Sequence, residues 1–160
     1  MSDQPSPTPR GPWSAAQVAT FLDDSVIPLR IAVASGSDWP LVLSVWFVRD
    51  GDDLLAATRP TSTLVRCLER RPNCAFEVAA DAPPYRGVRG RAAVTIDRGA
   101  GAATLDRLLD RYLGGVDSPL ATRLRADAQD EVSLRLRPVT LTTWDYGRRM
   151  ASSLAPHEGR

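Results

Sequence analysis

The chain has 160 residues, of which 43% are apolar, and its charges nearly cancel at +1. This length suits one compact domain with a single hydrophobic core. The near-neutral charge predicts no general affinity for nucleic acid or membrane surfaces, and no apolar run approaches the ~20 residues of a membrane helix. No signal peptide is recognisable, so we expect a cytoplasmic protein without nucleic-acid or membrane partners.

The composition of the two ends predicts tails around one domain. Four of the first twelve residues are proline, which is typical of a disordered segment over residues 1–12. Ser14 and Gln17 have the spacing of a capping box, so a helix should begin there. Residues 151–160 are expected to form a second flexible tail. One folded domain should therefore span residues 13–150.

About seven strand-like runs with short turns follow along the chain. The alternation of apolar and polar residues predicts strands over 29–34, 41–48, 53–58, 74–80, 86–96, 131–137 and 139–146, with Pro138 separating the last two. Helices are predicted after residue 62, around Leu105–Leu113 and from Pro119. A parallel sheet would need a helix after nearly every strand, and the first three strands have none, so a barrel is favoured.

The segment from Asp53 to Pro72 has the pattern of an anion site. A strand, DLLAAT, leads through the polar turn RPTST into the helix LVRCLERR. The unpaired amides of the first helical turn and the helix dipole attract negative charge, and hydroxyl and guanidinium groups add donors. A phosphate is the natural ligand. An ordinary helix cap with surface arginines remains the alternative for this segment.

The order of three motifs resembles a known family. PLVLSVWFV, then LAATRPTSTLVRCLERRPN, then YRGVRGRA resembles the FMN-binding split-barrel proteins related to pyridoxamine 5'-phosphate oxidase, over residues 14–147. The resemblance implies a mainly β fold with helices (α+β), a split β-barrel, and a homodimer with the flavin in the groove between its subunits.

The resemblance also implies which residues bind the cofactor. The second strand would run beside the isoalloxazine ring and the polar turn would hold the phosphate, while two residues would reach across from the partner subunit and a late tryptophan would approach the ring. The residues beside the ring would be Leu43, Ser44, Val45 and Trp46, and those that hold the phosphate would be Thr58, Arg59, Ser62, Thr63 and Arg66. The residues from the partner subunit would be Tyr85 and Arg86, and the late tryptophan is Trp144. For both tryptophans, core or interface packing is the alternative.

One position departs from the family pattern. Many relatives have a lysine two residues after the turn serine, where it holds the phosphate, and this chain has Leu64. Arg59 or Arg66 could replace that charge. Weak FMN binding, another cofactor or none are the alternatives. Members that use the deazaflavin coenzyme need a broader basic groove, which three arginines could provide: Arg86, Arg89 and Arg91.

Other chemistries find little support in the sequence. The single histidine, His157, lies in the expected C-terminal tail, which disfavours Ser-His-Asp or Cys-His hydrolysis, a histidine zinc site and haem ligation. The acidic run RDGDD is more typical of a hairpin turn than of a calcium site, so no metal is expected.

We therefore expect an FMN-dependent oxidoreductase that transfers a hydride between the reduced cofactor and a small organic acceptor. A deazaflavin-dependent reductase, or a cofactor carrier without turnover, is the alternative. No catalytic residue is identified; Tyr85 and Ser44 are candidate proton donors only by position.

Overall fold

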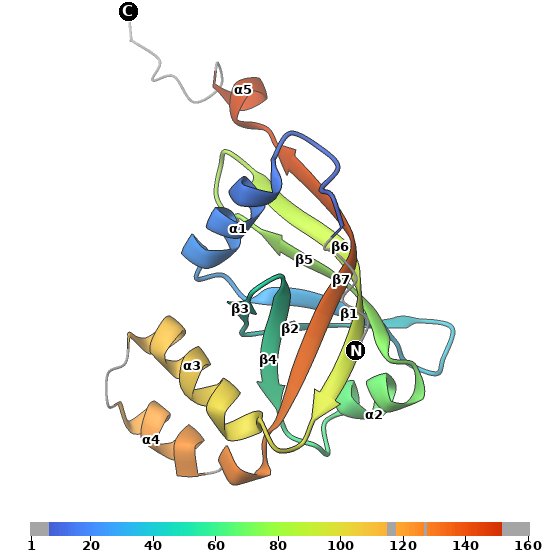
Figure 1. Cartoon of the computed structure of the whole chain (residues 1–160), viewed down its shortest axis with the longest axis vertical. Coiled ribbons are helices and arrows are strands. Elements are labelled where there is room, and N and C mark those ends of the chain that lie inside the picture. Colours follow the sequence, from blue (N-terminus) through green and yellow to red (C-terminus); the bar gives the residue numbers. More distant parts are fainter. Residues whose placement is uncertain (1–6, 115–117, 127, 152–160) are drawn as a thin grey trace, which may run out of the picture.

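A seven-stranded antiparallel sheet curls around one core, with helices at its ends and along one side (Figure 1). The computed structural model describes residues 7–114, 118–126 and 128–151. Along the sheet the strands follow the order β2-β1-β5-β6-β7-β4-β3. The expectation of a mainly β fold with helices is confirmed.

The bounds of the elements are as follows. The strands are β1 (Leu29–Ala34), β2 (Pro40–Val45), β3 (Val48–Asp50), β4 (Asp53–Thr58), β5 (Asn73–Ala79), β6 (Arg86–Asp97) and β7 (Val132–Asp145). The helices are α1 (Ala15–Asp24), α2 (Thr63–Arg70), α3 (Gly101–Leu113), α4 (Pro119–Ala126), the 3-10 helix η1 (Ala128–Asp130) and α5 (Gly147–Met150). Among these helices, none combines the length and apolar composition required to cross a bilayer.

The predicted second strand, residues 41–48, belongs to two separate strands in the structure. β2 ends at Val45 and pairs with β1, whereas β3 begins at Val48 and pairs with β4. Because β2 and β3 lie at opposite edges of the sheet order, the chain changes edge at Trp46 and Phe47. Phe47 is fully buried at this corner. The apolar run over residues 41–48 therefore gives no sign of this corner, which depends on the strands that β2 and β3 pair with.

The two predicted final strands are one strand in the structure. β7 continues through Pro138, and its pairing with β6 shifts register between Arg91, opposite Thr140, and Ala92, opposite Pro138. Val139 is the extra residue of this bulge. A proline has no amide hydrogen to donate to the ladder, and a bulge is one of the few places where a strand accommodates it. The prediction that Pro138 ends a strand is therefore wrong.

Helices close the two ends of the barrel and cover part of its side. α1 and α2 contribute Val18, Leu22, Leu64, Val65 and Leu68 to the main core, and Figure 1 shows these helices at opposite ends. α3 and α4 form a second apolar cluster against the outside of β4. The capping box predicted for α1 is confirmed, with both Ser14–Gln17 hydrogen bonds present.

The segment before α1 lies along β7. Arg10 bridges to Thr142: its amide donates to the Leu141 carbonyl at 3.0 Å, and its carbonyl accepts from the Thr143 amide at 2.7 Å. Gly11 has a φ of +118°, and a Cβ at this position would lie 2.2 Å from the Thr143 carbonyl oxygen. Residues 7–12, which the sequence assigned to a tail, are thus placed beside the sheet, while residues 1–6 and 152–160 lie outside the described residues.

Candidate functional site

The turn before α2 gathers hydroxyl groups and a guanidinium at a helix N-terminus. Ser62 is the N-cap, and its hydroxyl accepts a hydrogen bond from the Val65 amide at 3.2 Å. Arg66 folds back over the turn and donates to the Thr61 carbonyl and the Thr63 hydroxyl, each at 2.9 Å. This set of groups, here called the anion turn, combines the helix dipole with a fixed positive charge.

Leu64 faces the core and not the anion turn. Its side chain is 2% exposed and packs in the main core with Val65 and Leu68. The positive charge at the turn comes instead from Arg66, four residues after the N-cap Ser62. Arg59 lies exposed at the start of the same loop. The chain thus has a leucine at position 64 in place of the family's lysine, and Arg66 lies at the turn.

β2 presents an open strand edge. Within the described residues it pairs with β1 alone, from Leu29 opposite Val45 to Ala34 opposite Pro40. Leu43 and Val45 pack against the core, and Ser44 points to the exposed face. An edge strand leaves alternate amide and carbonyl groups unpaired. These groups can contact a flat ring without any contribution from a side chain.

The ring of Trp46 packs on α3. It stacks on Tyr112 with centroids 4.8 Å apart and an angle of 8° between the planes. Within this chain, the Trp46 side chain therefore serves in packing, the alternative given for it above. The backbone of Trp46 follows directly after β2, which ends at Val45.

The exposed face of the sheet carries a row of polar residues across five strands. The register places them side by side in the order Ser44, Arg30, Glu77, Arg89 and Thr142. Arg30 and Glu77 form a 3.5 Å ion pair.

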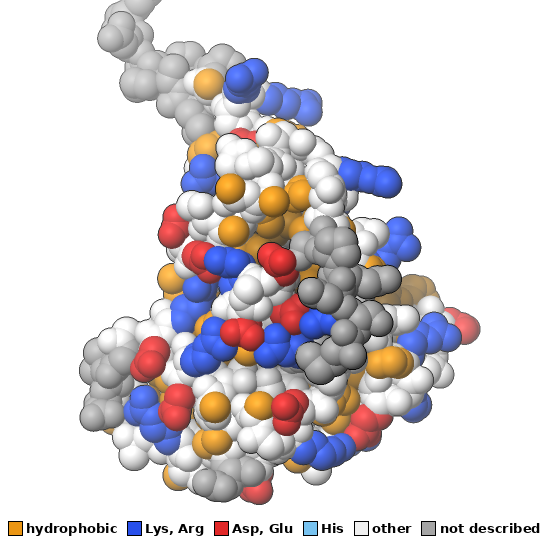
Figure 2. Space-filling model, viewed as in Figure 1, with side chains coloured by type: hydrophobic (Ala, Val, Ile, Leu, Met, Phe, Trp, Pro, Cys, Tyr) orange, Lys and Arg blue, Asp and Glu red, His pale blue; other side chains and the backbone are white. Residues whose placement is uncertain are grey.

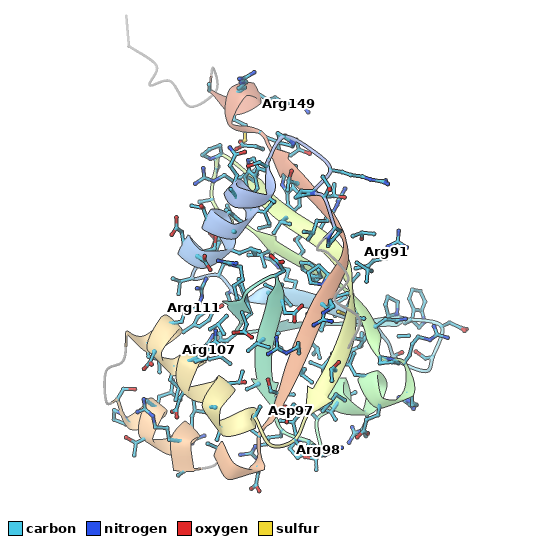
Figure 3. The ribbon with its side chains drawn as sticks, in the orientation of Figure 1. Arg91, Asp97, Arg98, Arg107, Arg111 and Arg149 are labelled. Carbon is cyan, nitrogen blue, oxygen red and sulfur yellow. The ribbon has the colours of Figure 1, made fainter. Side chains whose placement is uncertain are left out.

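A groove of about 430 Å³ crosses the same face, over a floor that includes Ala32, Ala75 and Gly90. Arg30, Glu77, Arg89 and Arg91 also line this groove, and Arg91 points away from the barrel in Figure 3. Three arginines against one glutamate make the groove basic.

Trp144 lies at the far end of this face. It pairs with Gly87, where an added Cβ would lie 2.7 Å from the indole ring. The guanidinium of Arg89 lies 5.6 Å from the ring centroid. Tyr85 and Arg86, both exposed, precede Gly87. The absence of a side chain at Gly87 leaves room for the indole.

One protomer does not bring the two groups of expected residues together. Thr58 pairs with Val132 at the start of β7, whereas Trp144 stands near its end. The twelve residue steps from Val132 to Trp144 correspond to about 40 Å of strand at ~3.3 Å per step. Figure 1 shows α2 and the end of β7 at opposite ends of the molecule. Tyr85, Arg86 and Trp144 are therefore remote from the anion turn of the same chain.

Arginine side chains form ion pairs with the acidic hairpin RDGDD, residues 49–53. Asp53, whose side chain is 10% exposed, accepts hydrogen bonds from Arg135 at 2.9 Å and from Arg137 at 3.3 Å. Asp50 accepts from Arg135 at 2.8 Å and from Arg107 at 3.1 Å, and these bonds, with that of Arg135 first, lower the pKa of Asp50. Acidic and basic side chains alternate across the middle of the molecule in Figure 2. The predicted hairpin is confirmed.

Sequence reasoning missed two residues that shape the site. Both lie at the end of α3: the Tyr112 hydroxyl binds the backbone of Phe47 and Ile27, and Arg111 binds the Leu22 and Ser25 carbonyls with its guanidinium near the Phe47 ring. In the sequence, Tyr112 fits the apolar stripe of its helix, and no local pattern marks the partner of its hydroxyl group.

Comparisons with known proteins agree with this architecture. The family model described as pyridoxamine 5'-phosphate oxidase matches residues 14–144. A conserved hypothetical protein from Mycobacterium tuberculosis has a similar structure, with a TM-score of 0.74, 19% identity, and coverage of 99% of this chain and 97% of that chain. An F420 reductase gives a TM-score of 0.64 at 26% identity, with 75% and 92% covered.

The FAD binding protein from Mycobacterium smegmatis gives a TM-score of 0.56 at 15% identity, with 83% of this chain and 97% of that chain covered. A search of curated protein sequences finds no significant match. The family match covers most of the chain, and the neighbours share its fold. The chain therefore belongs to the pyridoxamine 5'-phosphate oxidase family of split barrels.

Proposed function

We propose that this protein is a homodimeric oxidoreductase that uses a flavin-type cofactor, with FMN as the first candidate. The anion turn is the observation that carries the proposal. Its hydroxyls, helix amides and Arg66 form a donor set that suits a phosphate monoester. The family match over residues 14–144 supports the same class of cofactor.

Different residues of the chain would bind the phosphate and the ring of the cofactor. Thr58, Arg59, Ser62, Thr63 and Arg66 would bind the phosphate. The open edge of β2 from Leu43 to Val45, and Trp46 directly after it, would contact the ring through their backbone. When bound, the flavin supplies hydride transfer to or from a small organic molecule. The protein contributes position and the exclusion of water.

A second copy of the chain would complete the site. Tyr85, Arg86 and Trp144 lie about 40 Å along β7 from the anion turn of their own subunit, so they can serve that turn only from a partner. The exposed face of the sheet suits such a partner, because its floor is made of small residues. Two exposed apolar side chains lie beside it: Val42 at 60% and Val139 at 54%.

The deazaflavin coenzyme is the second candidate, and the basic groove favours it. Arg30, Arg89 and Arg91 line the groove against the single carboxylate of Glu77. A cofactor with an acidic tail would gain from this charge. The similarity to an F420 reductase at 26% identity supports this candidate, since F420 is a deazaflavin.

Titration of the purified protein with FMN and with the deazaflavin coenzyme tests the proposal. Absorption spectra and tryptophan fluorescence report binding, and sedimentation reports the oligomeric state. Arg66→Ala should weaken binding about 10- to 100-fold, because a charge-assisted hydrogen bond contributes ~1.5–3 kcal/mol. Arg123→Ala, which removes an exposed arginine on α4, is the matched control and should bind like the wild type.

The possible results separate the alternatives. Equal binding by the Arg66→Ala variant would contradict the phosphate assignment. A monomer that still binds the cofactor would remove Tyr85 and Arg86 from the site. Turnover of NAD(P)H or reduced deazaflavin with a panel of quinones and enones distinguishes an enzyme from a carrier that binds without turnover.

A further inference from the structure

The Tyr112 hydroxyl stands between two segments that would otherwise continue the β1–β2 ladder. The last residue pair of that ladder is Leu29 opposite Val45. The same register, continued by two residues, would place Ile27 opposite Phe47. In the structure the Phe47 amide donates to the Tyr112 hydroxyl at 3.3 Å, and this hydroxyl donates to the Ile27 carbonyl at 3.1 Å. A side chain thus bridges two backbone groups that a regular antiparallel pair could join directly.

Contacts of the tyrosine ring hold the hydroxyl in this place. The ring stacks on Trp46, 4.8 Å away between centroids. The guanidinium of Arg111 lies 5.1 Å from the Phe47 ring centroid and 5.9 Å from that of Tyr112. It also donates to the carbonyls of Leu22 and Ser25 at the end of α1. Figure 3 shows Arg111 reaching from α3 toward that end of α1.

The protonation state of Tyr112 fits its role in the bridge. Only a neutral phenol can donate to the Ile27 carbonyl while it accepts from the Phe47 amide. Burial raises the pKa of Tyr112 above its ordinary value, although the hydrogen bond from Phe47 acts in the opposite direction. The phenol is therefore neutral at physiological pH.

We propose that Tyr112 is a positioning residue for the cofactor. Its ring acts as a wedge that separates β2 from β1 after Val45, and its hydroxyl, hydrogen-bonded to the backbone on both sides, sets the course of the backbone at Trp46 and Phe47. The proposed cofactor ring lies along this edge, so the wedge determines the position of the backbone groups that would contact the ring. The inference rests on the proposed function, because it concerns the same strand edge.

Tyr112→Phe removes the hydroxyl and keeps the ring that stacks on Trp46. Since the ring still holds the segments apart, the Phe47 amide loses its acceptor, and its hydrogen exchange in the cofactor-free protein should become at least about fivefold faster. The affinity for FMN or the deazaflavin coenzyme, whichever the wild type binds, should fall about five- to tenfold. Tyr146→Phe, at an exposed tyrosine, is the control and should change neither value.

Each contrary result overturns a different step. Unchanged exchange at Phe47 would show that the hydroxyl does not hold the corner, and faster exchange throughout α2 and β5 would show a general loss of stability in place of positioning. Unchanged affinity in a variant with a faster Phe47 amide would separate the corner from the cofactor. If the wild type binds neither cofactor, the proposed function fails, and this inference fails with it.

Discussion

Asp53 should be the residue of the β3–β4 hairpin whose charge matters most for stability. Asp53→Asn keeps the shape of the side chain but removes the charge that two arginines share. Breaking a buried ion pair costs ~3–5 kcal/mol and an exposed pair contributes ~0–1 kcal/mol. The Asp53 side chain is 10% exposed, while those of Arg135 and Arg137 are 39% and 49% exposed. An intermediate loss of about 2–3 kcal/mol is therefore expected.

Part of the network survives the substitution, which limits the loss. Arg135 keeps its 2.8 Å hydrogen bond to Asp50, and only the contacts with the buried carboxylate change. For a chain of this length, each kcal/mol lowers the melting temperature by about 2–4 °C. The variant should melt roughly 4–12 °C below the wild type.

Urea unfolding followed by tryptophan fluorescence measures the difference directly. Asp52→Asn is a matched control in the same hairpin, because Asp52 is exposed, and its loss should stay within ~0.5 kcal/mol. The dependence of the unfolding free energy on urea should be the same in all three proteins. An Asp53→Asn variant as stable as Asp52→Asn would refute the role of the network.

Two further predictions concern pH and the core. The hydrogen bonds from Arg49 to Asp23 and from Arg135 to Asp50 lower the pKa of each carboxyl below its ordinary value of 3.8. Their contribution to stability is therefore complete above that value and is lost as the pH falls through the lower pKa of the folded state, so the urea midpoint should drop below about pH 4. Leu64→Ala should cost about 2–5 kcal/mol and Leu64→Met less than ~1.5 kcal/mol. Equal losses in urea unfolding would contradict the placement of Leu64 in the core.

Local patterns predicted those parts of the fold that depend on neighbours in sequence. The capping box at Ser14, the hairpin at Gly51 and the strand–turn–helix unit around Ser62 all have short-range signals. The corner at Trp46 and Phe47 has none, because the break depends on which distant strands the two halves join. The continuity of β7 through Pro138 likewise depends on β6, whose pairing continues on both sides of the bulge.

The local geometry of the candidate site was predictable to the same degree. Hydroxyls before a helix predict an anion turn, and the position of Arg66 on the first turn of α2 makes it a partner of that turn. The structure buries the Leu64 side chain in the core, a placement that its position in the sequence does not reveal by itself. The Tyr112 hydroxyl binds Phe47, which lies 65 positions earlier in the chain, and Ile27, which lies 85 positions earlier. No local sequence pattern indicates these contacts.

The open edge of β2 and the separation of the two residue groups have a common explanation. An exposed strand edge invites another backbone to pair with it, and natural proteins usually cover or protect such edges. Here the edge is apolar on its core side, and the sheet face beside it has a floor of small residues. A cofactor ring along the edge and a second subunit over the face would cover both. In the proposed dimer, the corner at Phe47 and the remote position of Trp144 would be parts of one intersubunit site, so cofactor binding and subunit association should stabilise each other.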